Sequence, residues 1–394
     1  MALLPLALLT PLLAPLRRLA ARGWLREADV DGLLRHAHPL ASLNRHYARV
    51  EARYWVADDM LALALRTAPG WPPARPGQHI QLLAERDGVR VGRSYSLTRV
   101  VGERLEIAVK RHPDGLLSPW LCEHLAVGQR VELQPAQGDL RWPMQAEAVC
   151  LLAAGSGLTP LLGLLREALE NGYRGPVLWL HYARHPGQRA WFGELEALAA
   201  RHPNLELRWS LTRGARADGC LEGHFQPRHL DGWAADLARS QALACGPAAF
   251  VEAVGEQLGA RFAGLQTESF SVPRWRSGEA PREVRLRFAR SQREVSGDSA
   301  ASLLEQAEAH GLRPAHGCRQ GICASCTCVL LSGCVRDLRS GALCSEPGQS
   351  IRLCVSAAHG DLALDLERAR SLAAIDRGYG LCALAVLASG LARV

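Results

Sequence analysis

Apolar and polar positions follow three different patterns along the 394 residues of this chain. Between Tyr47 and about Pro143, short runs of alternating apolar and polar residues are separated by glycines. Many short strands divided by turns are typical of a small antiparallel β-barrel. The expected strands include Leu61–Leu65, His79–Leu83, Arg93–Leu97, Leu105–Val109 and Val131–Leu133.

The pattern changes at Ala148, because Val149–Ala154 is a continuous apolar run that is typical of a buried parallel strand. Strand-like and helix-like segments then alternate over ~120 residues, which predicts a doubly wound α/β domain. The expected strands are Val177–Tyr182, Leu205–Leu211 and Gln241–Ala244, and the expected helices are Leu161–Leu169, Trp191–Ala200 and Trp233–Arg239.

A third segment, Glu283–Glu367, follows a proline-rich and charged stretch that we interpret as a linker. It begins with a predicted hairpin (Val284–Phe288 and Arg293–Val295) and a helix over Ser302–His310, and it ends in short strands. The predicted organisation is an extension (1–44), a barrel (45–146), an α/β domain (147–272), a linker (273–282), a small third domain (283–367) and a tail (368–394).

The N-terminal extension is rich in leucine and carries no charge over residues 2–16. A membrane-spanning helix needs roughly 20 apolar residues, and we expect Pro5, Pro11 and Pro15 to break one here. Arginines follow at 17, 18, 22 and 26, interleaved with apolar residues such as Trp24. Two interpretations stay open: a helix packed on the next domain, or a basic amphipathic segment lying on a membrane surface.

Composition narrows the function classes. The chain is 48% apolar and 22% charged, with a net charge of +7, and Lys110 is its only lysine. It has no basic stripe interleaved with aromatic residues and no nucleic-acid-binding motif, so we expect no nucleic-acid partner. Seven of the 12 cysteines lie between Cys318 and Cys354 without the regular pairing of a disulfide framework, which favours a reducing cytoplasm.

The cysteines of the third domain carry the most specific motif of the chain. Cys318, Cys323, Cys326 and the distant Cys354 have the C-x4-C-x2-C…C spacing that holds a 2Fe–2S cluster. Zinc sites more often show paired short spacings, and a set of buried free cysteines is the other alternative. A cluster of this kind carries single electrons, so the rest of the chain is expected to supply them.

Four weaker motifs precede the cysteines. In Arg93-Ser94-Tyr95-Ser96, strand alternation puts Arg93 and Tyr95 on one face and Ser96 on the other. An arginine fork suits a pyrophosphate, a tyrosine ring can lie against a flavin, and a serine hydroxyl can bond the flavin atom that accepts hydride. Further along, Ser118 is expected to cap a helix that extends to His124, so that backbone amides face a phosphate.

The other three motifs lie in the α/β domain. Gly155-Ser156-Gly157-Leu158-Thr159-Pro160 follows a buried strand and precedes a helix, which suits a pyrophosphate at the helix N-terminus. Cys245-Gly246-Pro247 closes a later strand, where a small polarizable side chain could face a nicotinamide. Glu268-Ser269-Phe270 returns the chain toward the barrel.

In this order the motifs resemble the FAD-containing ferredoxin–NADP reductase superfamily, fused at its C-terminus to a plant-type ferredoxin, over about residues 47–367. The resemblance implies a Greek-key FAD barrel, a doubly wound NAD(P) domain and a β-grasp ferredoxin domain. It implies that FAD is bound by Arg93, Tyr95 and Ser96, with its phosphate side at Val109, Lys110, Gly115, Leu117 and Ser118. It assigns NAD(P)H to Gly155, Gly157, Thr159, Pro160, Cys245, Gly246 and Pro247, and it puts Glu268 and Phe270 near the flavin ring. The implied catalytic residues are Ser96, Cys245 and Glu268.

The sequence also leads to two more specific expectations, one for the nucleotide and one for the electron acceptor. No acidic residue follows the second strand, and Arg184, Ser210 and Arg213 could meet a 2′-phosphate, so NADPH is favoured and NADH stays open. The domain order, the long extension and the Cys-Arg-Gln-Gly-Ile-Cys loop resemble bacterial partners of membrane fatty-acyl desaturases. We therefore expect a cytoplasmic protein that meets the inner face of the membrane. A soluble or ring-hydroxylating oxygenase as the acceptor, and a non-catalytic redox sensor or carrier, are the alternatives.

Overall fold

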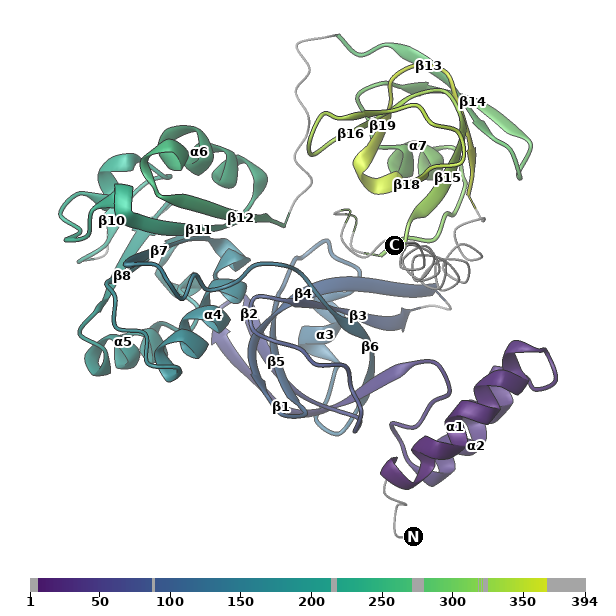
Figure 1. Ribbon diagram of the computed structural model, residues 1–394, viewed down its shortest axis with the longest axis horizontal. Coiled ribbons are helices and arrows are strands. Elements are labelled where there is room, and N and C mark those ends of the chain that lie inside the picture. Colours follow the sequence, from purple (N-terminus) through teal and green to yellow (C-terminus); the bar gives the residue numbers. More distant parts are fainter. Residues whose placement is uncertain are drawn as a thin grey trace, which may run out of the picture. The chain divides into compact units, whose positions relative to one another are not determined.

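The computed structural model describes residues 6–86, 89–213, 218–270, 280–317, 319, 321 and 325–366. The chain divides into two compact units, Met1–Ser271 and Val272–Val394. Most of the expected linker, two of the four motif cysteines (Cys318 and Cys323) and the tail 368–394 lie outside the described residues. Figure 1 shows the described helices and strands in sequence colours.

The N-terminal extension forms two helices, α1 (Leu6–Ala21) and α2 (Glu27–Ala37). Pro11 and Pro15 lie within α1, whose 16 residues are fewer than the roughly 20 that a membrane-spanning helix needs. Each proline removes one backbone donor, but burial of Leu13 against Val30 and Leu34 of α2 offsets part of that cost. In the part of the chain that the structure describes, no helix has the length and apolarity needed to cross a bilayer.

The predicted barrel is confirmed, and it closes in the strand order β1-β2-β5-β4-β3-β6. Its strands are β1 (His46–Ala57), β2 (Met60–Thr67), β3 (His79–Arg86), β4 (Val89–Val101), β5 (Arg104–Lys110) and β6 (Arg130–Gln137). Leu61, Leu63 and Leu65 alternate into a fully buried core, as a period of two residues requires. A short helix, α3 (Ser118–Glu123), follows β5.

The α/β part contains a six-stranded parallel sheet in the order β10-β9-β8-β7-β11-β12, which confirms the doubly wound fold. Its strands are β7 (Ala148–Ala154), β8 (Val177–Ala183), β9 (Leu205–Leu211), β10 (Leu221–Glu222), β11 (Ser240–Gly246) and β12 (Gly264–Ser269). Its helices are α4 (Leu158–Glu170), α5 (Phe192–Arg201) and α6 (Ala248–Leu258). β7 and β8 are buried along their whole length, so they have continuous apolar runs instead of alternation.

One expected element of this part was wrong. Trp233–Arg239 is not a helix: only Leu237–Arg239 forms a single 3-10 turn, and its N-cap Asp236 accepts a hydrogen bond from the Ala238 amide. Trp233 is buried in the core beneath the sheet. The side chain thus serves packing, and the local aspartate bond competes with helix formation.

The second unit has the mixed sheet of a β-grasp domain, in the order β14-β13-β20-β15-β18, beside a smaller sheet, β17-β16-β19. The strands are β13 (Glu283–Phe288), β14 (Arg293–Asp298), β15 (Thr327–Ser332), β16 (Val335–Asp337), β17 (Leu343–Cys344), β18 (Ser350–Arg352), β19 (Ser356–Ala358) and β20 (Leu362–Asp365). Helix α7 (Leu303–Ala309) starts at a capping box in which Ser302 and Glu305 exchange hydrogen bonds.

Candidate functional site

The Gly155–Pro160 loop and the Cys245–Pro247 turn lie at the same edge of the parallel sheet. They follow β7 and β11, which are neighbours, and the strand order reverses between them, with β8 beside β7 and β12 beside β11. Ligands of doubly wound domains bind outside the carboxyl ends of the strands at such a switch point. The fold therefore brings two motifs that are far apart in the sequence side by side at one edge of the sheet.

Glycine is required at both ends of the first turn of the nucleotide loop. Gly155 has a φ of +55°, in the left-handed region that favours glycine. A Cβ atom at Gly157 would lie 2.0 Å from the carbonyl oxygen of Cys245, so the loop and the turn pack backbone against backbone. The Thr159 hydroxyl donates to the Ser156 carbonyl at 3.0 Å and holds the loop at the start of α4. This arrangement suits the close approach of a pyrophosphate to the helix N-terminus.

Cys245 and Glu268 are partners on the adjacent strands β11 and β12. The Cys245 side chain is fully buried, and burial together with the charge of Glu268 raises its pKa. Burial raises the pKa of the Glu268 carboxyl to about 7, so this group can gain or lose a proton near neutral pH. Phe270 follows at the end of β12, where its amide donates to the Gly246 carbonyl at 3.1 Å.

Glu268 also approaches the barrel. Its Oε1 lies 3.9 Å from Nδ1 of His79, and His79 is the strand partner of Ser96. The structure therefore brings the three predicted catalytic residues, Ser96, Cys245 and Glu268, to one region between the barrel and the sheet. Sequence reasoning missed His79, and its register opposite Ser96 is the only signal that could have found it.

Strand β4, which carries Arg93, Tyr95 and Ser96, has the expected alternation of side chains between its two faces. Tyr95 pairs with the core residue Ile80 and packs against the barrel core, whereas Ser96 pairs with His79 and is 5% exposed. Burial raises the pKa of the Tyr95 hydroxyl. Nη1 of Arg93 donates to the Gly92 carbonyl at 2.8 Å. The roles of Arg93, Tyr95 and Ser96 in binding FAD stay predictions.

The turn after β5 is arranged differently from expectation. Ser118 is the first residue of α3 and not its cap: Leu117 holds the cap position, and the Ser118 hydroxyl accepts a hydrogen bond from the His112 amide at 3.1 Å. The reason is the tight bend at Gly115, whose amide donates back to the His112 carbonyl. The side chains of Val109 and Leu117 are buried in the barrel core, so only their backbones could meet a phosphate.

The ammonium group of Lys110 lies beside the nucleotide loop. It is 3.3 Å from Oδ2 of Asp59 and would be 3.8 Å from a Cβ atom at Gly155. The only lysine of the chain thus reaches from the end of β5 toward the Gly155 turn. A further residue that sequence reasoning missed, the fully buried His181, bonds the Gly155 carbonyl through Nε2 at 2.9 Å. Because burial lowers the pKa of His181 to about 4, this side chain is neutral at pH 7 and Nε2 is the donor.

The predicted 2′-phosphate site is only partly assembled. Arg184 and Arg213 follow β8 and β9, both are exposed, and the Arg213 amide donates to the Arg184 carbonyl at 2.8 Å. Ser210 is fully buried, and its hydroxyl donates to the Gly223 carbonyl at 2.7 Å. The two arginines therefore remain candidates for binding the 2′-phosphate, whereas the Ser210 hydroxyl already donates its hydrogen bond to the backbone.

In the second unit, Cys326 and Cys354 lie side by side. Their sulfur atoms are 3.3 Å apart, well beyond the ~2.05 Å of a disulfide bond. Both side chains are almost fully buried, and the Gly321 amide donates to the Cys354 sulfur at 3.2 Å. Two close sulfurs with an amide donor fit the ligands of an iron–sulfur cluster, whose thiolates accept such bonds.

The backbone of the cysteine loop is held by two arginines. Arg352 donates to the Gly321 carbonyl, and Arg319 forms a forked ion pair with Glu308 of α7. Gly321 has a φ of +72°, and a Cβ atom there would lie 2.7 Å from the Val355 side chain. The loop thus needs glycine at this position in order to curl over Cys354.

The other described cysteines of this unit have structural surroundings. Cys328 is fully buried in the core, where burial raises its pKa. The Cys344 sulfur lies 2.8 Å from the side-chain Oε1 of Gln349, and the Cys334 sulfur lies 3.9 Å from the Val335 backbone carbonyl. These three cysteines are not among the predicted cluster ligands.

Three protein-family models match consecutive parts of the chain. They are an oxidoreductase FAD-binding domain over residues 58–142, an oxidoreductase NAD-binding domain over 151–256 and a 2Fe-2S iron-sulfur cluster binding domain over 287–359. The matches agree with the barrel, the parallel sheet and the β-grasp unit. FAD, a nicotinamide dinucleotide and a 2Fe–2S cluster are therefore the cofactors of this chain.

Known proteins with the same domains support this assignment. An NADPH oxidoreductase of Mycobacterium tuberculosis is 34% identical over 85% of this chain and 88% of its own length. A ferredoxin reductase component of 3-ketosteroid-9-alpha-monooxygenase from the same species is 31% identical over 67% and 78%. The crystal structure of phthalate dioxygenase reductase superposes with a TM-score of 0.57 at 25% identity, covering 82% of this chain and 98% of that one. The chain therefore belongs to the FAD-dependent ferredoxin–NADP reductase superfamily, in the group of NAD(P)H oxidoreductases that carry a C-terminal 2Fe–2S ferredoxin domain.

Proposed function

We propose that this chain takes hydride from NADPH at FAD and delivers single electrons through its 2Fe–2S cluster to a membrane-bound fatty-acyl desaturase. The hydride transfer is supported by one observation. Between strand β4 and the sheet edge that carries the Gly155–Pro160 loop lie four residues together: Ser96, His79, Glu268 and Cys245. FAD supplies the conversion of a hydride into two single-electron transfers, which a cluster of this type requires.

The residues of the chain have distinct tasks in this proposal. Arg93 and the Gly115–Ser118 turn would hold the FAD phosphates, and Tyr95 would lie against the ring. The Gly155–Pro160 loop would hold the dinucleotide, while Cys245 positions the nicotinamide. The Glu268 carboxyl, with a pKa of about 7, would hold or release a proton beside the ring. The four motif cysteines, Cys318, Cys323, Cys326 and Cys354, would ligate the cluster.

The preference for NADPH rests on Arg184 and Arg213, and the name of the mycobacterial relative supports it. Arg213→Ala is expected to raise KM for NADPH by about 10- to 100-fold, because a charge-assisted bond to the 2′-phosphate contributes about 1.5–3 kcal/mol. KM for NADH should stay within about twofold, since NADH lacks that phosphate. Steady-state kinetics with both nucleotides measures the ratio. The exposed Arg201, which bonds only the Ala197 carbonyl of its own helix, provides the matched control as Arg201→Ala. Equal effects of Arg213→Ala on both nucleotides would remove the assignment.

The membrane-bound acceptor is supported by the helical hairpin α1–α2. Between the helices, Trp24 is 75% exposed, and Leu33 on α2 is 74% exposed. Arg18, Arg22 and Arg26 of the same segment are also exposed, and their positive charges would complement anionic lipid head groups. The match to phthalate dioxygenase reductase covers nearly that whole protein but only 82% of this chain, and the family-model matches start at residue 58. The hairpin therefore lies outside the three family-model matches.

A vesicle-binding experiment tests the membrane contact. The purified protein is expected to co-sediment with phosphatidylglycerol-containing vesicles at low salt and to be released as salt rises, because screening weakens the arginine contacts. Trp24→Ala should lower the binding by at least about 10-fold, since burial of a large apolar side chain contributes about 1.5–3 kcal/mol. Trp55→Ala is the matched control, because Trp55 is also exposed, at 52%, but lies on the barrel.

A second candidate acceptor is the oxygenase component of a monooxygenase or dioxygenase, which the names of several relatives favour. Failure of the unmodified protein to co-sediment with anionic vesicles at low salt would favour this soluble acceptor. NADPH-dependent reduction of cytochrome c by the purified protein would exclude a non-catalytic redox sensor or carrier.

A further inference from the structure

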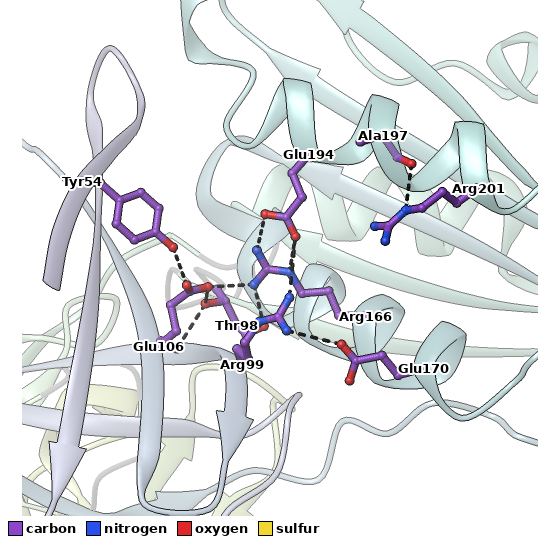
Figure 2. Close-up of polar contacts among 9 residues, drawn as sticks. All are labelled: Tyr54, Thr98, Arg99, Glu106, Arg166, Glu170, Glu194, Ala197 and Arg201. Carbon is purple, nitrogen blue, oxygen red and sulfur yellow. Dashed lines mark hydrogen bonds and ion pairs between the residues drawn. The ribbon is translucent and has the colours of Figure 1, made fainter. Parts of the chain in front are cut away.

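Arg166 is a buried arginine on α4 that connects the nucleotide domain to the barrel. Its guanidinium is only 4% exposed. Nη1 donates to the Thr98 carbonyl of β4 at 2.9 Å and to Glu106 of β5 at 2.7 Å. Nε and Nη2 donate to the two carboxylate oxygens of Glu194 on α5, at 2.7 and 2.6 Å. Figure 2 shows the guanidinium between the two carboxylates.

The contacts around Arg166 fix its geometry. Glu106 also accepts hydrogen bonds from Tyr54 and, at 2.7 Å, from the Thr98 hydroxyl. Although burial alone would raise it, the pKa of Glu106 is lowered by Arg166 and by these donors, so the carboxylate stays ionised at neutral pH. Only the planar guanidinium of an arginine can donate two parallel hydrogen bonds to Glu194 and also reach both Glu106 and the Thr98 carbonyl.

One turn earlier on α4, Gly163 brings the helix against the backbone of β4. A Cβ atom at Gly163 would lie 2.5 Å from the Leu97 carbonyl oxygen and 3.3 Å from Cα of Thr98. The helix and the strand therefore touch directly at the two residues that follow Ser96. Two independent contacts, a glycine approach and a buried guanidinium, thus hold the same stretch of β4.

The same helix begins at the nucleotide loop, because α4 starts at Leu158, directly after Gly155–Gly157. A rigid helix of a few turns therefore has the dinucleotide loop at one end and is held, through Gly163 and Arg166, against the strand that carries Ser96. Hydride transfer needs donor and acceptor carbon and nitrogen about 3–3.5 Å apart, and a displacement of 1 Å can cost about 100-fold in rate.

We infer that Arg166 and Gly163 are positioning residues that set the distance between the nicotinamide and the flavin ring. The inference rests on the proposed transfer of hydride from NADPH to FAD, and it assigns to this network a task beyond holding two domains together.

The test uses the full-length holoenzyme with Arg166→Lys, which keeps the charge but not the fork, and with Gly163→Ala, which keeps every charge. Stopped-flow measurements follow flavin reduction by NADPH and by NADPH deuterated at the transferred position. We expect each variant to reduce flavin at least about 10-fold more slowly, with a larger deuterium isotope effect, since the transfer step becomes fully rate-limiting. FAD content and the Kd for NADPH should stay within about threefold, because neither residue lies in the predicted binding motifs.

The matched control is Glu170→Gln, which lies on the same helix and removes only the exposed ion pair with Arg99, seen at the edge of Figure 2. It should leave the rate and the isotope effect unchanged. A lower Tm of Arg166→Lys with an unchanged rate and isotope effect would overturn the inference and leave a structural role. If Arg166→Lys does not fold, Gly163→Ala alone decides. Failure of the unmodified enzyme to reduce its flavin with NADPH would instead contradict the proposed function.

Discussion

Cys354→Ala is expected to remove the cluster and to stop electron delivery while leaving the flavin reactive. The Cys354 sulfur lies 3.3 Å from that of Cys326 and accepts a hydrogen bond from the Gly321 amide, so its loss would remove one of the four predicted thiolates and the contact that holds the loop. Cytochrome c reduction should fall by at least about 100-fold, since even outer-sphere changes at metal sites cost 10- to 100-fold. NADPH-dependent ferricyanide reduction, which can draw electrons from the flavin, should persist. Iron content and the visible spectrum give the direct measurement.

Cys344→Ala is the matched control for this experiment, because the Cys344 sulfur contacts the Gln349 side chain and Cys344 is not a predicted ligand. It should retain iron and both activities. A Cys354→Ala protein with two irons per chain and normal cytochrome c reduction would show that the fourth ligand has been assigned wrongly.

Gly157→Ala is expected to lower kcat/KM for NADPH by at least about 100-fold, because the added methyl cannot be accommodated. Its Cβ would lie 2.0 Å from the Cys245 carbonyl oxygen and 2.6 Å from the Gly246 amide nitrogen, both backbone atoms. The nucleotide loop or the Cys245 turn must therefore move, and both are predicted to hold the dinucleotide. FAD content should be normal, since the barrel core is separate. Flavin reduction by NADPH measures the loss, and reduction by dithionite shows that the flavin itself is intact.

Gly193→Ala serves as the control for Gly157→Ala, because a methyl group added there would have nothing within 4 Å and the residue lies in the first turn of a helix of the same domain. This variant should match the unmodified enzyme in kcat/KM. A Gly157→Ala enzyme with unchanged kinetics would mean that the dinucleotide does not approach this loop.

Much of the fold follows from periodicity. The alternation in Leu61–Leu65 and the continuous apolar run Val149–Ala154 both identify their strands, because side chains on a half-buried strand alternate and those on a fully buried strand need not. The helix predicted over Trp233–Arg239 was wrong for a local reason: the Trp233 side chain fills the core, and only Leu237–Arg239 forms a single 3-10 turn.

The site was predictable to the extent that it consists of local motifs. The glycines at 155 and 157 and the spacing of the cysteines are local patterns that can be recognised in the sequence. The roles of His79, His181 and Arg166 cannot be recognised in this way, because they depend on strand register and on which domain faces them. Ser210 shows the converse: it had the residue type expected near a phosphate, but tertiary structure directs its hydroxyl to Gly223.

The buried guanidinium on α4 also determines how this protein can be divided. If the chain were cut between the barrel and the parallel sheet, Glu106 would lose the positive charge of Arg166. Loss of one partner of a buried ion pair costs about 3–5 kcal/mol. The barrel and the parallel-sheet domain should therefore be exchanged together, because recombination between them is disfavoured. A graft of a different electron-carrier domain onto this reductase should accordingly join after residue 271, where the two compact units meet in the sequence.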